Sequence, residues 1–227
     1  MLNCKNLDEL WTQVNQITEE NFPDNDLMPI LGGGQEKNPK LMIVFINPTY
    51  RNISSSKNWN GPRFPFIGRK RPWIEFHKAG LFEDELIEKI KTNTDWSIDL
   101  TNQVLDFLKK KSLYFTNIVK NTGHNADLPK ADQINLYLTS FKREIELVNP
   151  AYIVAFGLIP INSLLSEKIK LSDYYDSVKK KGNVIPYSLE INSKEYKLIP
   201  CYYPIGRGNP GKAVEILKLV KNTVLVD

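Results

Sequence analysis

The fold is decided by the run Leu41-Met42-Ile43-Val44-Phe45-Ile46-Asn47-Pro48. Its six consecutive apolar residues do not alternate with polar ones, which is typical of a strand buried on both faces of a parallel sheet. The strand is expected to stop at Asn47-Pro48, because proline cannot continue a central strand. The run therefore predicts a central strand with an asparagine at its carboxyl end.

Further strands and helices are predicted along the rest of the chain. Short apolar segments at 112–116, 151–156 and 196–203 predict strands, and the last is expected to pair with 184–191 across a turn at 192–193. Apolar residues at helical spacing predict helices over about 6–20, 100–108, 134–148, 160–165 and 213–224. Without any linker-like stretch, this alternation predicts one domain over residues 1–227. Its fold class is expected to be α/β, a three-layer α/β/α sandwich with a central, mostly parallel sheet of about four strands.

A ligand is expected at the carboxyl ends of these strands. In open α/β sheets the binding crevice lies outside the carboxyl ends of the parallel strands. The segments found there begin at Asn47, Asn117, Gly157 and Tyr203. Two of them start with an asparagine just where a strand stops, so the geometry points to these two residues.

The bulk composition excludes several classes of protein. With 41% apolar and 25% charged residues, the 227-residue chain has the composition of an ordinary soluble protein. No apolar run approaches the roughly 18–20 residues of a membrane helix, and the N-terminus lacks the order of a secretory signal. Two distant cysteines, Cys4 and Cys201, exclude a disulfide framework, a four-cysteine zinc site and an iron–sulfur cluster. We expect a cytoplasmic monomer that binds no membrane, metal ion or diffusible cofactor.

Charge is distributed unevenly, although the formal net charge is only +4. Residues 1–36 contain seven acidic residues and one basic residue, Lys5. Residues 37–74 contain no acidic residue and eight basic ones: Lys37, Lys40, Arg51, Lys57, Arg63, Arg69, Lys70 and Arg71. A local excess of this kind predicts a surface that faces phosphates, and the alternative is a solvated basic loop.

Several short motifs follow one another between residues 41 and 212. The first are Ile46-Asn47-Pro48-Thr49, the segment 61–68 ending in Pro65-Phe66-Ile67-Gly68, and Arg71-Pro72-Trp73 followed by 76–81. Later come Tyr114-Phe115-Thr116-Asn117-Ile118-Val119-Lys120, the segment 151–165 and the segment 201–212. Each motif alone is weakly specific. The ordered set resembles the uracil-DNA glycosylase superfamily, and it is most similar to the mismatch-specific uracil/thymine and single-strand-selective branches.

That resemblance implies a monofunctional DNA glycosylase of base-excision repair. Members of the superfamily flip a deaminated or mismatched base, uracil first among them, out of DNA and hydrolyse its N-glycosidic bond. By resemblance, Asn47 positions the attacking water, Asn117 reads the base edge and Tyr203 assists the leaving base. The other implied site residues are Pro48, Phe64 and Phe66 at the base, and Arg207, Asn209 and Lys212 at DNA phosphates.

Each implied residue also has a plain structural interpretation. Asn47 could be a turn residue that bonds its own backbone, and Asn117 a strand-end cap. The two phenylalanines could be core residues beneath a long loop. A stretch of about 24 residues without regular structure (49–72) is nevertheless unusual unless it has a function. The turn 206–208 could simply connect a strand to a helix.

Departures from the family pattern motivate an alternative function. Tyr203 stands where many branches have a histidine, and loss of an oxyanion donor typically lowers a rate by on the order of 10²–10³. Phe45 and Thr49 stand where the first motif often has glycines. The alternative is a non-catalytic nucleobase-binding or nucleic-acid-binding protein of the same fold. A small α/β hydrolase or a nucleotide-binding protein is disfavoured, because the sequence has no nucleophile elbow, dinucleotide turn or Walker lysine.

Overall fold

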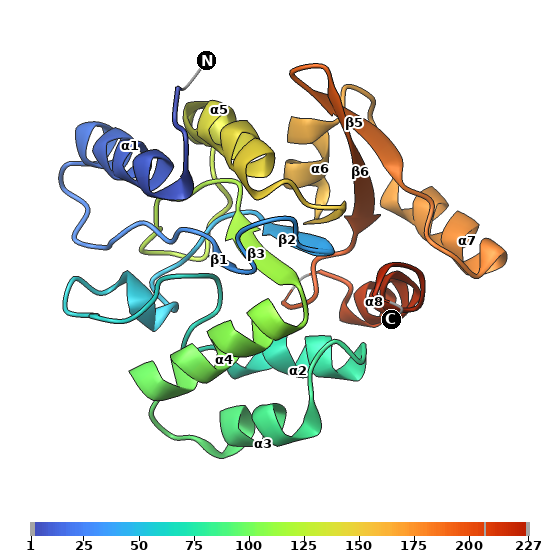
Figure 1. Cartoon of the computed structure of the whole chain (residues 1–227), viewed down its shortest axis with the longest axis horizontal. Helices are drawn as coiled ribbons and strands as arrows, with labels where there is room; N and C mark the ends of the chain where they lie inside the picture. Colours follow the sequence, from blue (N-terminus) through green and yellow to red (C-terminus); the bar gives the residue numbers. More distant parts are fainter. Residues whose placement is uncertain (1–2, 207, 226–227) are drawn as a thin grey trace.

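A six-stranded sheet forms the centre of the computed structural model, which describes residues 3–206 and 208–225 (Figure 1). The strand order is β1-β3-β2-β4-β6-β5. The strands are β1 (Gly33–Gly34), β2 (Leu41–Phe45), β3 (Leu113–Asn117), β4 (Tyr152–Phe156), β5 (Tyr187–Ile191) and β6 (Lys194–Cys201). The central strands β3, β2, β4 and β6 run parallel, whereas β1 and β5 are antiparallel strands at the two edges.

The sheet is larger than the sequence predicts. The expectation of about four strands accounts for the parallel centre and not for the full sheet of six. β1 consists of two glycines, so no apolar pattern marks it as a strand. β5 does pair with β6 across Asn192-Ser193, where φ is 49° and 63°. The predicted hairpin is therefore confirmed, and the predicted number of strands is wrong.

β2 lies in the middle of the sheet because it is apolar on both faces. Each of its five residues is fully buried. Leu41, Ile43 and Phe45 belong to the core on one side of the sheet, and Met42 and Val44 belong to the core on the other side. This two-sided burial confirms the prediction made from the unbroken apolar run.

Helices cover both faces of the sheet (Figure 1). One core contains residues of α2 (Lys70–Lys78), α3 (Asp84–Thr92), α4 (Ile98–Lys110), α7 (Leu171–Lys181) and α8 (Pro210–Val224). The other contains residues of α1 (Leu7–Asn21), α5 (Ala131–Val148) and α6 (Leu158–Leu164). The arrangement is compatible with the predicted sandwich, while α2, α3, α7 and the short helix η1 (Ile53–Ser55) lie where no element is predicted.

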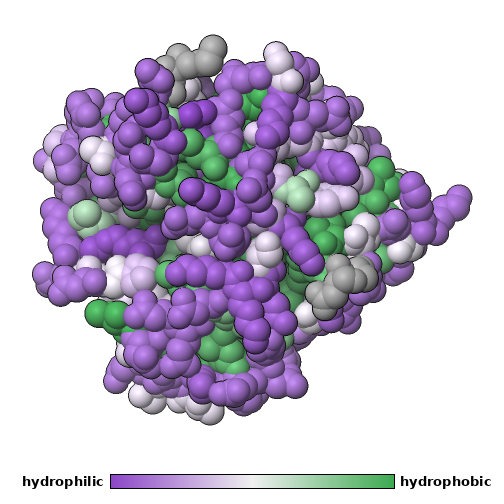
Figure 2. Space-filling view, in the orientation of Figure 1, coloured by the Kyte–Doolittle hydropathy of each residue, from purple (hydrophilic) through white to green (hydrophobic). Residues whose placement is uncertain are grey.

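The length and hydropathy of the described helices decide whether one of them can span a membrane. Across the described ranges 3–206 and 208–225, no helix is both long enough and apolar enough to cross a membrane. The face drawn in Figure 2 is mostly hydrophilic, with scattered apolar patches.

A buried polar cluster joins β3 to α5. Lys120 and Glu144 are 1% and 0% exposed, and the distance from Lys120 Nζ to Glu144 Oε2 is 2.6 Å. Tyr114 and Thr116 donate their hydroxyl groups to Glu144 Oε1 at 2.9 and 2.7 Å. Burial lowers the pKa of Lys120, and the Glu144 carboxylate acts in the opposite direction. Three residues of the motif that contains Asn117 therefore fix that segment against the helix behind it.

Gly32 leaves the space that this cluster occupies. A Cβ atom at Gly32 would overlap the Tyr114 hydroxyl and would lie 2.8 Å from Glu144 Oε1. We expect Gly32→Ala to lower the free energy of unfolding by about 2–3 kcal/mol, because the cluster or the backbone must shift. Gly211→Ala is the matched control, since a Cβ atom there meets its nearest neighbour at 3.9 Å. Chemical denaturation compares the two variants, and equal stabilities would contradict the prediction.

Candidate active site

The segments that leave β2 and β3 run side by side beyond the sheet. Two backbone hydrogen bonds, of 2.9 and 3.0 Å, continue the pairing just after the strands. Two more, of 2.8 and 3.2 Å, join residues 48–50 to Gly123. This pairing holds the turn that carries Asn47 beside the end of β3, which carries Asn117.

Asn117 is the last residue of β3 and is 2% exposed. It lies beside Phe45 in the register of the sheet. By strand alternation its side chain is on the face of Leu113 and Phe115, the face that α2 and α4 cover. Its side-chain nitrogen is buried and has no hydrogen-bond partner among the described residues. Since a buried unsatisfied polar group costs about 1–3 kcal/mol, this amide marks a position that a ligand can complete.

Asn47 is held through its side-chain nitrogen. This nitrogen donates to the carbonyl of Asp127 at 3.3 Å and to the carbonyl of Pro48 at 3.4 Å. The bond to Asp127, in the loop after β3, goes beyond the local contact that a plain turn asparagine makes. With the nitrogen engaged, the side-chain oxygen of Asn47 is the atom left to accept a hydrogen bond from a water molecule.

The structure distinguishes the two phenylalanines that the resemblance places at the base. Phe64 is 1% exposed and belongs to the core under the loop. Phe66 is partly buried, has a positive φ of 71°, and its ring lies 4.5 Å from that of Phe45 in an edge-to-face arrangement. Its carbonyl accepts hydrogen bonds from the Arg69 N–H at 3.0 Å and from Trp73 Nε1 at 3.1 Å. Phe66 is therefore the better placed of the two to contact a ligand at the strand ends.

Tyr203 follows β6 and is partly buried. Burial raises the pKa of its hydroxyl to about 12, while the nearby Arg69 acts to lower it. The hydroxyl is therefore protonated at neutral pH and can donate a hydrogen bond. Arg69 also lies near Tyr50, whose pKa is lowered first by the hydrogen bond from Arg51 and further by Arg69. The positive charge of Arg69 therefore acts on both Tyr203 after β6 and Tyr50 after β2.

Because burial raises the pKa of some tyrosines, we expect the free energy of unfolding to fall at alkaline pH. Burial raises the pKa of Tyr137 from 10 to about 12, as it does for Tyr203. Because the folded state favours the protonated form, this stabilisation is complete below about pH 10 and is lost as the pH rises toward about 12. For the fully buried Tyr137 it amounts to about 2–3 kcal/mol. We expect denaturation at increasing pH to show this fall, reduced in Tyr137→Phe; an identical fall in the variant would contradict it.

The start of α8 has a structural role that the resemblance does not imply. Asn209 is the N-cap of this helix, and its side-chain oxygen accepts a hydrogen bond from the Lys212 N–H at 3.2 Å. Lys212 Nζ lies 4.4 and 5.5 Å from the ring centroids of Tyr175 and Tyr202. Arg207, the third residue assigned to phosphates, lies outside the described residues. At this turn Asn209 therefore stabilises the helix, and Lys212 supplies a positive charge beside two aromatic rings.

Two of the eight basic residues in 37–74 bind backbone carbonyl groups of the protein itself. The guanidinium of Arg63 donates to the backbone carbonyls of Ser56 and Trp59 at 2.9 and 2.6 Å. The ammonium of Lys70 donates to the carbonyl of Lys91 at 2.8 Å. For these two residues, neither a phosphate-facing surface nor a solvated loop describes the main contact.

Exposed apolar side chains follow the parallel strands, a feature that sequence reasoning missed. Tyr50 and Ile53 come after β2, Leu128 comes after β3, and Leu158 comes after β4. Leu128 is 65% exposed, immediately after the residue whose carbonyl binds Asn47. Because they follow parallel strands, these residues lie at the same edge of the sheet as the candidate site.

The described part of the chain contains no cluster of metal-ligating residues. There, no group of three or more His, Cys, Asp or Glu residues could hold a metal ion. His124, in the loop after β3, is exposed and pairs with Asp26 at 3.2 Å.

No protein-family model matches the sequence, and no curated protein matches it significantly. The candidate site is thus defined by its geometry and by the short motifs.

Proposed function

We propose that this protein is DNA glycosylase-like and hydrolyses the N-glycosidic bond of a deaminated or mismatched base, uracil first among them. The observation that carries the proposal is the buried amide nitrogen of Asn117, which has no partner among the described residues and lies beside the turn of Asn47. A side-chain amide offers two donors and one acceptor, which suits the imide edge of uracil. The ordered motifs that resemble uracil-DNA glycosylases support the same chemistry.

In this proposal each residue has one role in the hydrolysis. A flipped base stacks on Phe66, a contact worth about 1–3 kcal/mol, and Asn117 donates to its carbonyl oxygen. The oxygen of Asn47 orients a water molecule toward the sugar carbon. As the C–N bond breaks, both bond electrons leave with the base, and Tyr203 donates a hydrogen bond to the resulting anion. The water oxygen then bonds to the sugar carbon and one proton of the water passes to the departing base, so that a free base and an abasic sugar are formed. An asparagine is a weak base, so the rate depends on positioning and on stabilisation of the leaving base.

The exposed residues beyond the strands support DNA as the partner. Tyr50 is about half exposed, and the Arg51 guanidinium lies 5.6 Å from its ring centroid. An exposed aromatic ring next to guanidinium groups suits unstacked bases and their phosphates. Leu128 and Leu158 add apolar surface that can contact bases exposed by flipping.

A non-catalytic nucleobase-binding or nucleic-acid-binding function is the second candidate. With a pKa of about 12, the Tyr203 hydroxyl is a far weaker acid than a protonated histidine. It therefore stabilises a departing anionic base less well. The same site could hold a base through Asn117 and Phe66 without hydrolysis.

Base release from labelled oligonucleotides that carry uracil, hypoxanthine or xanthine separates the two functions. Release of one base, with an equal amount of abasic sites, would support the glycosylase and identify its substrate. Binding of these oligonucleotides without release would assign the binding function. If the protein neither releases a base nor binds these oligonucleotides, both proposed functions are overturned.

Tyr203→Phe tests the role of the hydroxyl. We expect the single-turnover rate of base release to fall by on the order of 10²–10³, because one donor to the leaving base is lost. Affinity for the oligonucleotide should change little, since the ring stays. Tyr202→Phe is the matched control, because it removes the same hydroxyl group from the neighbouring residue. The ring of Tyr202 lies beside Lys212 and Tyr175. Equal rates in Tyr203→Phe and the wild type would remove Tyr203 from the mechanism.

A further inference from the structure

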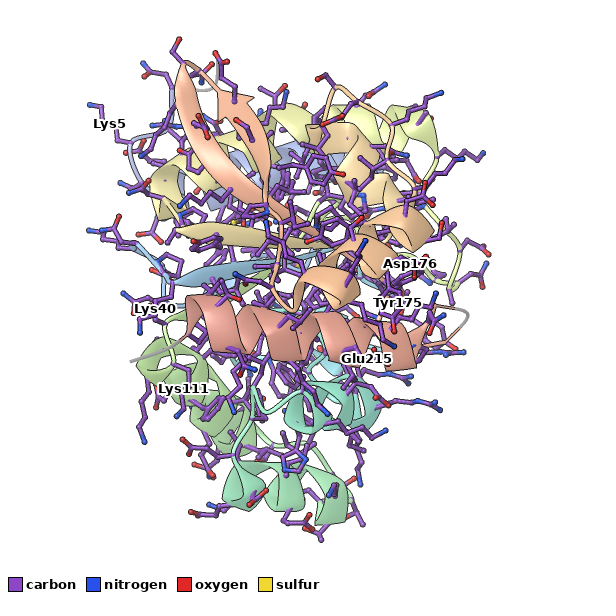
Figure 3. All side chains as sticks on the ribbon, turned by 90° about the vertical axis from the view of Figure 1, so that its right-hand side faces the viewer. Lys5, Lys40, Lys111, Tyr175, Asp176 and Glu215 are labelled. Atoms are coloured by element: carbon purple, nitrogen blue, oxygen red, sulfur yellow. The ribbon has the colours of Figure 1, made fainter. Side chains whose placement is uncertain are left out.

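A pocket of about 340 Å³ lies at the other end of the parallel strands. Lys40 and Ser112, which directly precede β2 and β3, line it. It is therefore at the amino ends of the strands, whereas the candidate active site is at their carboxyl ends. Figure 3 shows Lys40 and Lys111 on one side of the molecule, with Tyr175 and Glu215 on the opposite side.

The wall of this pocket is strongly basic. Lys110, Lys111 and Lys221 line it together with Lys40, and Glu83 is the one acidic residue among the described residues of the lining. Lys111 lies 2.8 Å from Glu83. The pKa of Glu83 is lowered first by this bond and also by Lys110. Even without Lys40, the described lining holds three ammonium groups and one carboxylate, so its charge suits an anion.

The floor of the pocket is apolar and partly aromatic. Leu81, Phe82 and Phe107 contribute to it, and the rings of the two phenylalanines are 4.4 Å apart. Lys111 Nζ lies 5.9 Å from the ring centroid of Phe107. The volume lies in the range of small-molecule sites, roughly 300–1,000 Å³, and the charged wall makes the lining more polar than is usual for them. The combination fits a ligand with a flat ring and an anionic group.

Gly80 allows Lys221 to reach the wall of the pocket. Gly80 follows α2 and has a φ of 75°, a conformation that favours glycine. A Cβ atom at Gly80 would lie 2.8 Å from Lys221 Nζ. The ammonium group at the end of α8 therefore lies against the backbone of the α2–α3 connection, where both residues line the pocket.

We propose that this pocket binds a phosphate-bearing ligand of mononucleotide size, with its phosphate at Lys110 and Lys221 and its ring on the aromatic floor. A phosphate monoester carries a charge of about −1.5 to −2 at neutral pH, which balances the excess of ammonium groups. Lysine binds phosphate as a point charge. The inference goes beyond the proposed function, because none of these residues belongs to the site at the carboxyl ends. A nucleic-acid backbone offers the same phosphate chemistry, and the experiment distinguishes the two sources.

Isothermal titration calorimetry with AMP, adenosine and an undamaged single-stranded oligonucleotide tests the inference. The pocket variant is Lys110→Gln with Lys221→Gln. The control variant, Lys109→Gln with Lys218→Gln, removes the same charge from the same two helices. Lys109 pairs with Asp106 at 3.6 Å, and Lys218 lines a different pocket beside Tyr175. Chemical denaturation confirms that both variants are folded.

We expect AMP to bind the wild type at least about tenfold more tightly than adenosine does. We expect the affinity of the pocket variant for AMP to be lower by roughly tenfold or more. The control variant should bind AMP like the wild type. If the pocket variant weakens binding of the oligonucleotide and AMP does not bind, the phosphate source is a nucleic-acid backbone and the mononucleotide is excluded. Equal losses in both variants, equal affinities for AMP and adenosine, or no binding that depends on Lys110 and Lys221 would overturn the inference.

Discussion

Glu144→Gln is expected to lower the free energy of unfolding by about 3–5 kcal/mol, because it leaves a buried ammonium group without its counter-charge. Glu144 is fully buried, and its carboxylate accepts a hydrogen bond from Lys120 Nζ at 2.6 Å. The rings of Trp11 and Phe141 lie 5.3 and 5.6 Å from the same ammonium, and they offset only part of the loss. A loss of this size is a large fraction of the roughly 5–15 kcal/mol that stabilise a typical domain. Chemical denaturation at neutral pH measures it.

The double variant Glu144→Gln with Lys120→Met is the control for this prediction. It removes both charges, and the glutamine oxygen can still accept hydrogen bonds from the hydroxyl groups of Tyr114 and Thr116. We therefore expect the double variant to be more stable than Glu144→Gln alone, as is common when both members of a buried pair are replaced. Losses that simply add would show that the two side chains are not coupled.

The buried cluster also bears on the candidate site, since it fixes the segment that follows Asn117. The backbone carbonyl of Lys120 accepts a hydrogen bond from the Ile30 N–H at 3.0 Å, which ties this segment to the chain that leads into β1. If the cluster contributes only to stability, the double variant should keep base release whenever it remains folded. The glycosylase assay on the folded double variant therefore separates a structural cluster from one that takes part in the chemistry.

Local sequence signals account for the elements that are predictable. β2 is an unbroken apolar run, and α1, α4 and α8 each begin with a capping side chain, from Asn6, Ser97 and Asn209. α2, α3 and α7 have no capping hydrogen bond from the residue before them. The predicted helix α6 lacks such a bond too, so α2, α3 and α7 are hidden mainly by their charge-rich sequences, which give no long apolar repeat. β1 is specified by its pairing with β3 and not by its own residues.

The candidate site is predictable where it depends on strand ends and unpredictable where it depends on distant contacts. Asn47 and Asn117 are found because each directly follows an apolar run that stops. Glu144 is missed because an acid in an amphipathic helix is normally solvated, and its burial depends on Lys120, 24 residues away. The contact of Asn47 with Asp127 joins residues 80 apart. Such pairings follow from the three-dimensional fold, which periodicity does not encode.

Asn47→Ala is expected to lower the rate of base release by on the order of 10²–10⁴, while binding of the damaged oligonucleotide is retained. The reason is that alanine has no oxygen to orient a water molecule, whereas the contacts of Asn117 and Phe66 with the base remain. Single-turnover base release and equilibrium binding, measured on the same oligonucleotide, give the two quantities.

Two controls exclude indirect effects of this substitution: a measurement of stability and the substitution of a matched asparagine. The side-chain nitrogen of Asn47 makes only long hydrogen bonds, of 3.3 and 3.4 Å, so the variant should lose less than about 1.5 kcal/mol of stability. Asn125→Ala changes an exposed asparagine of the neighbouring loop and should leave the rate unchanged. If Asn47→Ala releases the base at the wild-type rate, Asn47 does not position the water. If it loses binding together with release, its side chain contacts the base, and the roles assigned to the two asparagines must be exchanged.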